Sequence, residues 1–258
     1  MTDDELVRER RGSVLIARLN RPAARNALSP SLMSAIGAAL LDGENDHGIG
    51  AVVLTGTGDR AFCAGMDLQQ FSDGEEMVPT DERAAQAFYR FLRGDVGVPV
   101  VGAANATAVA GGFELLLGCD VIVASSEAKF GLPEVKRGLF PAGGGTQLGT
   151  RIPLGIALEM VLTGDSISAD RAYEVGLVNA VVAPAEVLAT AVSYAERIAA
   201  NGPLGVAAAK ELVRLGSVDA DRAAERLGDL QARVFASQDA REGALAFLEK
   251  RPPVWQGR

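Results

Sequence analysis

The chain has 258 residues, of which 48% are hydrophobic and 22% charged, so it is long enough to bury a substantial core. Its 33 acidic and 25 basic residues give a net charge of −8, which argues against a protein that mainly holds nucleic acid or anionic membrane. No segment approaches the roughly 18 uninterrupted apolar residues of a membrane span, and the N-terminal MTDDELVRERRGS is too charged for a signal peptide. We therefore expect a cytoplasmic protein with neither a nucleic-acid nor a membrane partner.

The N-terminal part of the sequence predicts a β-hairpin followed by a helix. Residues 5–10 and 14–19 have strand patterns on either side of a short turn, which is typical of a hairpin. Ser29 is a natural N-cap and Pro30 suits the first helical position, so residues 30–42 are predicted to form an amphipathic helix.

An alternation of strands and helices continues toward the middle of the chain. Residues 51–56 form an apolar run typical of a buried strand, and a strand after a crossover helix favours parallel pairing. The same order recurs with residues 99–105, 111–118 and 120–125, while residues 81–91 predict a further helix. The predicted fold class is α/β, built as a series of turns.

The last hundred residues are predicted to be mostly helical. Alanine- and leucine-rich helical patterns, broken by glycine and proline, run from Pro153 onward, with one short strand predicted at residues 177–182. We expect a core domain at residues 1–195 and a C-terminal helical region at residues 196–258. Patterning alone leaves open whether that region packs on its own domain or on a neighbouring subunit.

The composition also restricts the chemistry. His47, the single histidine, lies in the polar connection DGENDHGIG, and nucleophile–histidine pairs or multi-histidine zinc sites would have to use it. Cys63 and Cys119 are expected to be reduced thiols, because no export signal is evident. Acid–base catalysis is therefore expected from carboxylates, lysine or tyrosine.

Two carboxylates and a glycine turn stand out in the segment of residues 99–145. Gly111 and Gly112 open a short apolar helix, and a free amide at Gly111 lies at the positive end of the helix dipole, which suits a developing anion. Glu114 lies on the same first turn, and Glu134 follows Pro133 in an apolar segment where a charge is costly without a partner. The alternative is that Glu114 only complements the dipole and the glycines are ordinary turn residues.

Several segments, in consistent order along almost the whole chain, resemble the crotonase, or enoyl-CoA hydratase/isomerase, superfamily. These segments are RPAARNAL, AFCAGMDL, AVAGGFELLLGCDVIVAS, FGLPEVKRGLFPAGGGTQ, LTGDSISADRAYEVGLVN and EGALAFLEKRPPVWQG. The resemblance implies a crotonase-like spiral of β-β-α turns followed by an all-helical region used for oligomerisation, as a homotrimer or a hexamer made of two trimers. It also implies an acyl-CoA thioester substrate and no metal or other cofactor, since coenzyme A is part of the substrate.

The resemblance implies particular roles for site residues. The backbone N–H groups of Met66 and Gly111 would hold the thioester oxygen, with Glu114 as the base on water and Glu134 as the acid at the α-carbon. Further substrate contacts are implied for Arg25, Ala64, Gly65, Asp67, Leu68, Pro133 and Ala142. The implied activity is an enoyl-CoA hydratase, which adds water reversibly and syn to a trans-2-enoyl-CoA to give a 3-hydroxyacyl-CoA.

Elementary chemistry agrees with this assignment. Adding water to a double bond conjugated with a thioester puts negative charge on the carbonyl oxygen, and each fixed donor there can matter by about 3 kcal/mol. Two carboxyls near one water can remove one proton and supply another if one is ionised and one neutral.

The chain also departs from the family pattern. Ala110 stands where a glycine is frequent, Met66 stands where a small residue is common, and Leu148-Gly149-Thr150 differs from the usual continuation. Residues 69–93 are expected to border the acyl pocket, and Lys250 and Arg251 are candidates for contacts with the phosphates of coenzyme A.

Other functions within and beyond the family stay open. One is another crotonase reaction, either enoyl-CoA isomerisation or dehydration of a hydroxyacyl-CoA, and the other is a non-catalytic relative that binds acyl-CoA or RNA. The presence of both glutamates favours hydration, because a double-bond shift can run with one carboxylate. The net charge of −8 argues against RNA.

Overall fold

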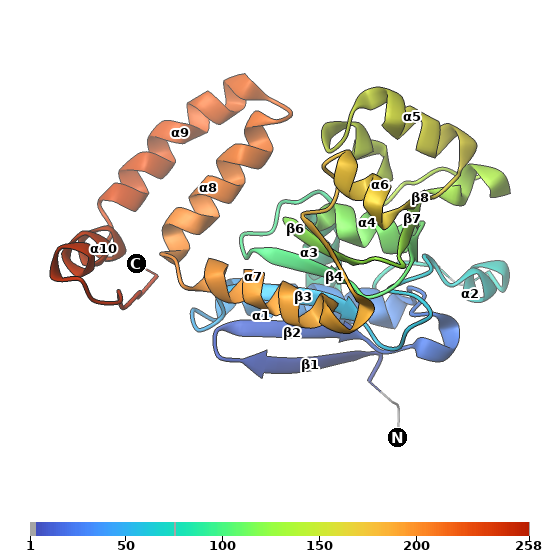
Figure 1. The fold of residues 1–258 in the computed structure, drawn as a ribbon, viewed down its shortest axis with the longest axis horizontal. Coiled ribbons are helices and arrows are strands. Elements are labelled where there is room, and N and C mark those ends of the chain that lie inside the picture. Colours follow the sequence, from blue (N-terminus) through green and yellow to red (C-terminus); the bar gives the residue numbers. More distant parts are fainter. Residues whose placement is uncertain (1–3, 75, 258) are drawn as a thin grey trace.

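The computed structural model describes residues 4–74 and 76–257, which fold around two sheets (Figure 1). The larger sheet has the strand order β1-β2-β3-β4-β6-β9, and the smaller has the order β5-β7-β8. The strands are β1 (Leu6–Arg11), β2 (Val14–Leu19), β3 (Ala51–Gly56), β4 (Val100–Ala104), β5 (Ala108–Val109), β6 (Val121–Ser125), β7 (Lys129–Gly131), β8 (Ile167–Ser168) and β9 (Ala180–Val182).

The predicted hairpin and the parallel pairing are both confirmed. β1 and β2 pair antiparallel, with Leu6 opposite Leu19, and β2 pairs parallel with β3, with Val14 opposite Ala51. β3, β4, β6 and β9 continue the parallel arrangement. The strand predicted at residues 177–182 is shorter than expected, since pairing begins only at Ala180.

Helices cover both faces of the larger sheet. On one face, α1 (Pro30–Asn45) and α3 (Glu82–Leu92) pack against each other and against side chains such as Leu15 and Val52. On the other face, α7 (Val187–Ala199) packs on β3, β4 and β6, over side chains such as Ile16. Strands buried on both faces need apolar residues at successive positions, which explains the continuous runs in the sequence.

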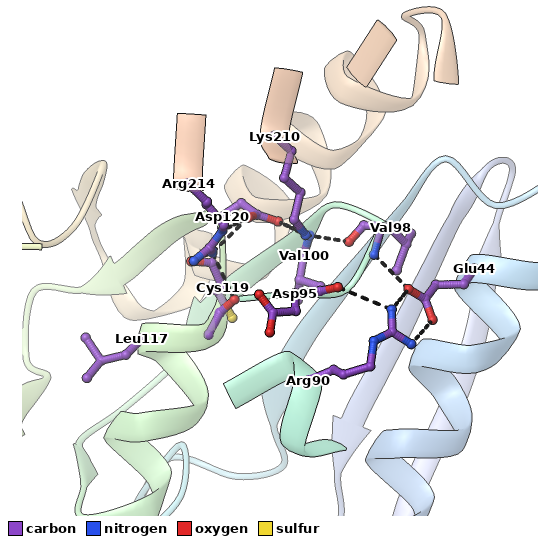
Figure 2. Close-up of polar contacts among 12 residues, drawn as sticks. Glu44, Arg90, Asp95, Val98, Val100, Leu117, Cys119, Asp120, Lys210 and Arg214 are labelled. Carbon is purple, nitrogen blue, oxygen red and sulfur yellow. Dashed lines mark hydrogen bonds and ion pairs between the residues drawn. The ribbon is translucent and has the colours of Figure 1, made fainter. Parts of the chain in front are cut away.

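An ion pair fixes the two helices of the first layer relative to one another. The guanidinium of Arg90 on α3 bonds the carboxylate of Glu44 on α1, with Nη1 at 3.0 Å from Oε2 (Figure 2). The same carboxylate accepts the Gly97 amide at 2.7 Å. The pair therefore ties both helices to the loop that enters β4.

From β4 onward, the chain alternates between the two sheets, which gives the fold its spiral course. β4 leads into β5, which is followed by α4 (Gly111–Gly118), and β6 leads into β7. β5 and β7 pair parallel in the smaller sheet, with Ala108 opposite Phe130. These short strands escaped sequence prediction, because two or three residues carry no recognisable alternation.

The remaining elements are short apart from the C-terminal helices. They are α2 (Leu68–Ser72), α5 (Leu154–Thr163), α6 (Ala169–Glu174), α8 (Pro203–Gly216), α9 (Ala220–Phe235) and α10 (Gln238–Glu249), with 3₁₀ turns at Pro22–Ala24, Pro133–Arg137, Gly145–Thr150 and Pro184–Glu186. Within the described ranges, none of the helices is long and apolar enough to span a bilayer.

The C-terminal helices stand partly apart from the sheets. In Figure 1, α8 and α9 form an antiparallel pair beside the core, and α10 lies beyond the end of α9. The boundary expected between residues 195 and 196 falls inside α7, which continues to Ala199. The division into a core and a helical region stays a proposal.

Candidate active site

The start of α4 is set by an unusual backbone conformation at Ala110. This residue has φ 51° and ψ −133°, in a region that side chains rarely adopt. Its N–H donates to the Gly131 carbonyl at 2.9 Å, and its carbonyl accepts the amides of Phe113 and Glu114 at 2.8 and 3.0 Å. These bonds turn the chain from β5 directly into α4 and leave the Gly111 amide at the half-buried start of the helix.

The amides of Gly111 and Met66 border the same place. Met66 lies opposite Leu28 in a parallel bridge. The two hydrogen bonds of this bridge run from the Leu28 amide to the Gly65 carbonyl and from the Asp67 amide to the Leu28 carbonyl, so the Met66 amide takes no part in them. Within the described part of the chain, neither the Met66 nor the Gly111 amide donates a hydrogen bond. A methyl group added at Gly111 would lie 3.7 Å from the Met66 nitrogen. The fold thus brings together the Met66 and Gly111 amides, the two donors that the family resemblance implied.

Glu114 is held in a buried pocket on the first turn of α4. Its side chain is 6% exposed, and its Oε1 accepts the amides of Gly143 and Gly145, each at 2.8 Å. Burial raises the pKa of the Glu114 carboxyl, while the bonds from Gly145 and Gly143 oppose part of that rise. One carboxyl oxygen is therefore fixed by the backbone, and the other takes no hydrogen bond from the residues described.

The loop that binds Glu114 needs its glycines. A methyl group at Gly143 would lie 2.6 Å from Glu114 Oε2, and one at Gly145 would lie 2.5 Å from a carbon of Pro141. Sequence reasoning gave this glycine run no part in the site. The only signal was the run of three glycines after Phe140-Pro141-Ala142, which does not reveal which side chain it wraps.

Glu134 lies in a more open position, at the start of the 3₁₀ turn Pro133–Arg137. Its residue is half-buried, and its Oε2 is buried without a hydrogen-bond partner. Burial raises the pKa of the Glu134 carboxyl, and the charge of Glu114 adds to the rise, whereas its own amide and Arg137 oppose it. The two carboxyls are thus within electrostatic reach of one another.

The other residues expected near the oxyanion position surround the segment of residues 64–68. Arg25 is exposed, and its carbonyl accepts the Ala64 amide at 3.1 Å, so it lies beside this segment. The Asp67 carboxylate has structural partners, since it caps α2 and takes an ion pair from Arg21 at 3.0 Å. Leu68 begins α2 and is 46% exposed. Their substrate contacts stay predictions.

The remaining candidates are divided between the site and the far end of the molecule. Pro133 is half-buried beside Glu134, and Ala142 is exposed next to Gly143. Lys250 and Arg251 follow α10, which Figure 1 shows at the opposite end from α2. Arg251 is also engaged by Glu242 and Glu249, each at 2.6 Å. Neither residue approaches the site of its own chain.

The thiols and the histidine lie outside this arrangement. Cys63 and Cys119 are both buried and free, and burial raises the pKa of each thiol to about 12. His47 lines a cavity of about 490 Å³ at the amino ends of β2, β3 and β4, where neither Glu114 nor Glu134 is present. Among the described residues, no three Asp, Glu, Cys or His side chains are grouped as metal ligands.

This fold, with two amides and two carboxyls at one site, defines the class of protein. The chain belongs to the enoyl-CoA hydratase/isomerase family, whose sequence model matches residues 9–258. The crotonase resemblance predicted from the sequence is thereby confirmed, together with its α/β fold.

Particular relatives are similar over nearly their whole length. The enoyl-CoA hydratase EchA19 of Mycobacterium tuberculosis is 40% identical, with 99% of this chain and 97% of that protein covered. The carnitinyl-CoA dehydratase of Proteus mirabilis is 39% identical, with 96% and 97% covered. A crystal structure of an enoyl-CoA hydratase from M. tuberculosis superposes with a TM-score of 0.91, at 41% identity over 99% of this chain and 100% of that one.

Proposed function

We propose that this protein is an enoyl-CoA hydratase, which adds water reversibly and syn to a trans-2-enoyl-CoA and releases a 3-hydroxyacyl-CoA. The observation that carries the proposal is the meeting of the free amides of Met66 and Gly111 with the carboxyls of Glu114 and Glu134. Names of relatives that act as hydratases support the same choice.

The two amides serve the thioester oxygen in this mechanism. Attack of water at the β-carbon moves electron density through the conjugated system to that oxygen, which becomes enolate-like. Donors already in place stabilise this charge without reorganisation, and each contributes about 3 kcal/mol by the usual cost of losing one. The dipole of α4 adds to the effect, because Gly111 lies at its positive end.

The two carboxyls divide the proton transfers. Glu114, with Oε1 fixed by two amides, uses Oε2 to take a proton from the attacking water. Glu134, whose pKa is raised and whose Oε2 has no partner, delivers a proton to the α-carbon as the neutral acid. The carboxyls act from the same side of the double bond, which gives syn addition. Dehydration runs through the same steps in reverse.

The acyl-CoA thioester is the proposed substrate, and the chain's own groups carry this chemistry without a cofactor. Substrate contacts are proposed for Arg25, Ala64, Gly65, Asp67, Leu68, Pro133 and Ala142. Residues 69–93, which include α2 and α3, are proposed to border the acyl group.

A direct test of the function is a panel of enoyl-CoA thioesters of increasing chain length. We expect loss of the conjugated-enone absorbance with trans-2-enoyl-CoA, and formation of the 3-hydroxyacyl-CoA shown by mass spectrometry. A protein that only shifts the double bond of a 3-enoyl-CoA, and adds no water to any member of the panel, would be an isomerase instead.

Dehydration is the second candidate, favoured by the carnitinyl-CoA dehydratase relatives at 39% identity. It needs the same four groups, so only the preferred acyl group and direction differ. Carnitinyl-CoA in the same panel separates the cases: a kcat/KM far above that for simple 3-hydroxyacyl-CoA substrates would identify the dehydratase.

A homotrimer or a hexamer of two trimers is the proposed assembly. The helical region carries exposed apolar side chains on each of its helices, including Val213 at 74%, Phe235 at 72% and Phe247 at 83%. Exposed apolar surface of this kind marks interfaces. Sedimentation equilibrium is expected to give three or six times the chain mass, and a uniform monomer at micromolar concentration would contradict the assembly.

A further inference from the structure

A half-buried charge cluster joins the C-terminal helix α8 to the end of α4. Lys210 and Arg214 project from α8 onto Asp120, which follows α4 (Figure 2). The Asp120 carboxylate lies 2.7 Å from Lys210 Nζ and 2.8 Å from Arg214 Nη2, and it also accepts the Val100 amide at 2.8 Å. The cluster therefore links α8, α4 and the start of β4.

Arg214 does more than pair with Asp120, because it also caps α4. Its Nη2 donates to the carbonyls of Gly118 and Cys119, at 3.1 and 3.0 Å. The last carbonyls of a helix have no partner within the helix, and a cation there also interacts favourably with the dipole. Arg214 thus satisfies carbonyl groups that α4 leaves unpaired.

Arg151 holds the same helix end from the other side. Its Nη1 donates to the carbonyls of Leu117 and Cys119, at 2.8 and 3.1 Å. Arg151 directly follows the turn Gly145–Thr150, whose first residue donates to Glu114. One loop therefore binds both ends of α4, and Arg214 adds a contact from the C-terminal region.

The helix is short enough to transmit a displacement from end to end. Its eight residues span about 12 Å, and hydrogen bonds inside a helix make it move as a unit. Gly111 and Glu114 lie at the end opposite the two arginines. A shift of the capped end would move the amide and the carboxyl relative to Met66 and Glu134.

We propose that Arg214 is a positioning residue for catalysis: by capping α4 from α8, it keeps the amide of Gly111 and the carboxyl of Glu114 in place against the substrate. The inference rests on the proposed function for these two groups. In this proposal, the C-terminal helical region stabilises the active site of its own chain.

The test compares R214Q, R214K and the control R226Q. Arg226 is a matched control, because its ion-pair partners, Glu211 at 2.6 Å and Asp229 at 3.7 Å, both lie within the same helical region. Crotonyl-CoA hydration gives kcat and KM. Acetoacetyl-CoA, whose enolate absorbs in the near ultraviolet, reports separately how well the bound oxygen is stabilised.

We expect R214Q to lower kcat about tenfold with KM within about twofold, since misplaced groups weaken the transition state more than binding. The band of bound enolate should weaken in parallel. R214K should lie between wild type and R214Q, because an ammonium keeps the charge and reaches fewer acceptors. R226Q should match wild type in both measurements.

Several results would overturn the inference. One is a wild-type kcat and enolate band in R214Q, and another is a loss of kcat in R226Q equal to that in R214Q. The inference also fails if R214Q changes only KM, or if its loss of kcat only follows the folded fraction measured by circular dichroism. If R214Q does not fold, wild-type values in R214K overturn it instead. Wild-type protein that hydrates no member of the enoyl-CoA panel would refute the proposed function alone, because the enolate band still reports on Arg214.

Discussion

The surroundings of the two glutamates differ, although both carboxyls have a raised pKa. Glu114 is enclosed: it is 6% exposed, and two backbone amides fix its Oε1. Glu134 is half-buried on a 3₁₀ turn, and its Oε2 is buried without a partner. The first carboxyl is oriented by the fold, and the second is left for an interaction that the chain itself does not supply.

This difference shows how one residue type can serve two purposes. Burial raises the pKa of both carboxyls, and backbone amides oppose part of the rise at each, two at Glu114 and its own amide at Glu134. Their mutual repulsion further discourages double ionisation, and the pair titrates as a unit. The two backbone bonds at Glu114 and the unpaired Oε2 of Glu134 support the proposal that Glu114 is the base and Glu134 the acid.

The largest predicted effect comes from removing either carboxyl. E114Q and E134Q are each expected to lower kcat for hydration about a thousandfold, since general acid–base catalysis contributes on this scale. The double variant should be at most about tenfold worse than either single one, because residues that act as a unit are not additive. Steady-state kinetics with crotonyl-CoA measures all three.

The same variants also test whether Glu114 and Glu134 have the proposed roles of base and acid. If E114Q leaves the shift of a 3-enoyl-CoA double bond at the wild-type rate, that shift runs without Glu114. If the two single losses multiply in the double variant, the carboxyls act independently. Either result contradicts a shared task for the pair.

A smaller effect is predicted when the enclosure of Glu114 alone is disturbed. In G143A, the new methyl group would lie 2.6 Å from Glu114 Oε2, so the carboxyl or the loop must shift. We expect kcat to fall about tenfold or more, because small misplacements of reacting groups are costly. Steady-state hydration and a thermal melt together measure it.

Gly155 on α5 offers the control for this change. A methyl group there meets nothing within 4 Å, so G155A should keep wild-type kcat. If G143A also keeps wild-type kcat while folded, the close fit around Glu114 has no bearing on turnover.

The smallest effect concerns stability and its dependence on pH. The pKa of Glu114 is raised above the usual 4.5, so the folded state binds its proton more tightly than the unfolded state. Wild-type stability should therefore decline as pH rises from the unfolded pKa through the folded one, then level off. E114Q lacks this decline, because glutamine does not titrate, and its side-chain oxygen can still accept both amides.

We expect E114Q to melt about 2 °C above wild type at pH 7 and to lose this advantage near pH 4, a shift typical of a change below 1 kcal/mol. Thermal melts between these pH values measure it, with E225Q on exposed α9 as the control. If E114Q instead exceeds wild type in melting temperature most strongly at pH 4, the pKa of Glu114 is lowered by folding and not raised.

The sequence by itself determined the class of fold and the identity of the main candidates. The apolar runs at β2, β3 and β4 were long enough to predict, because a strand buried on both faces must be apolar at successive positions. Gly111 and Glu114 could be named because a glycine pair at a helix start and a carboxylate in its first turn are local features.

Only the tertiary structure decided what these residues meet. The bonds from Gly143 and Gly145 to Glu114 join segments about thirty positions apart, and Arg214 reaches Cys119 across 95 positions. No local pattern specifies such contacts, because they depend on how the sheets and helices pack. The two-residue strand β5 and the positive φ of Ala110 likewise depend on distant segments, since β5 pairs with β7 and Cys63 and the Ala110 amide bonds Gly131.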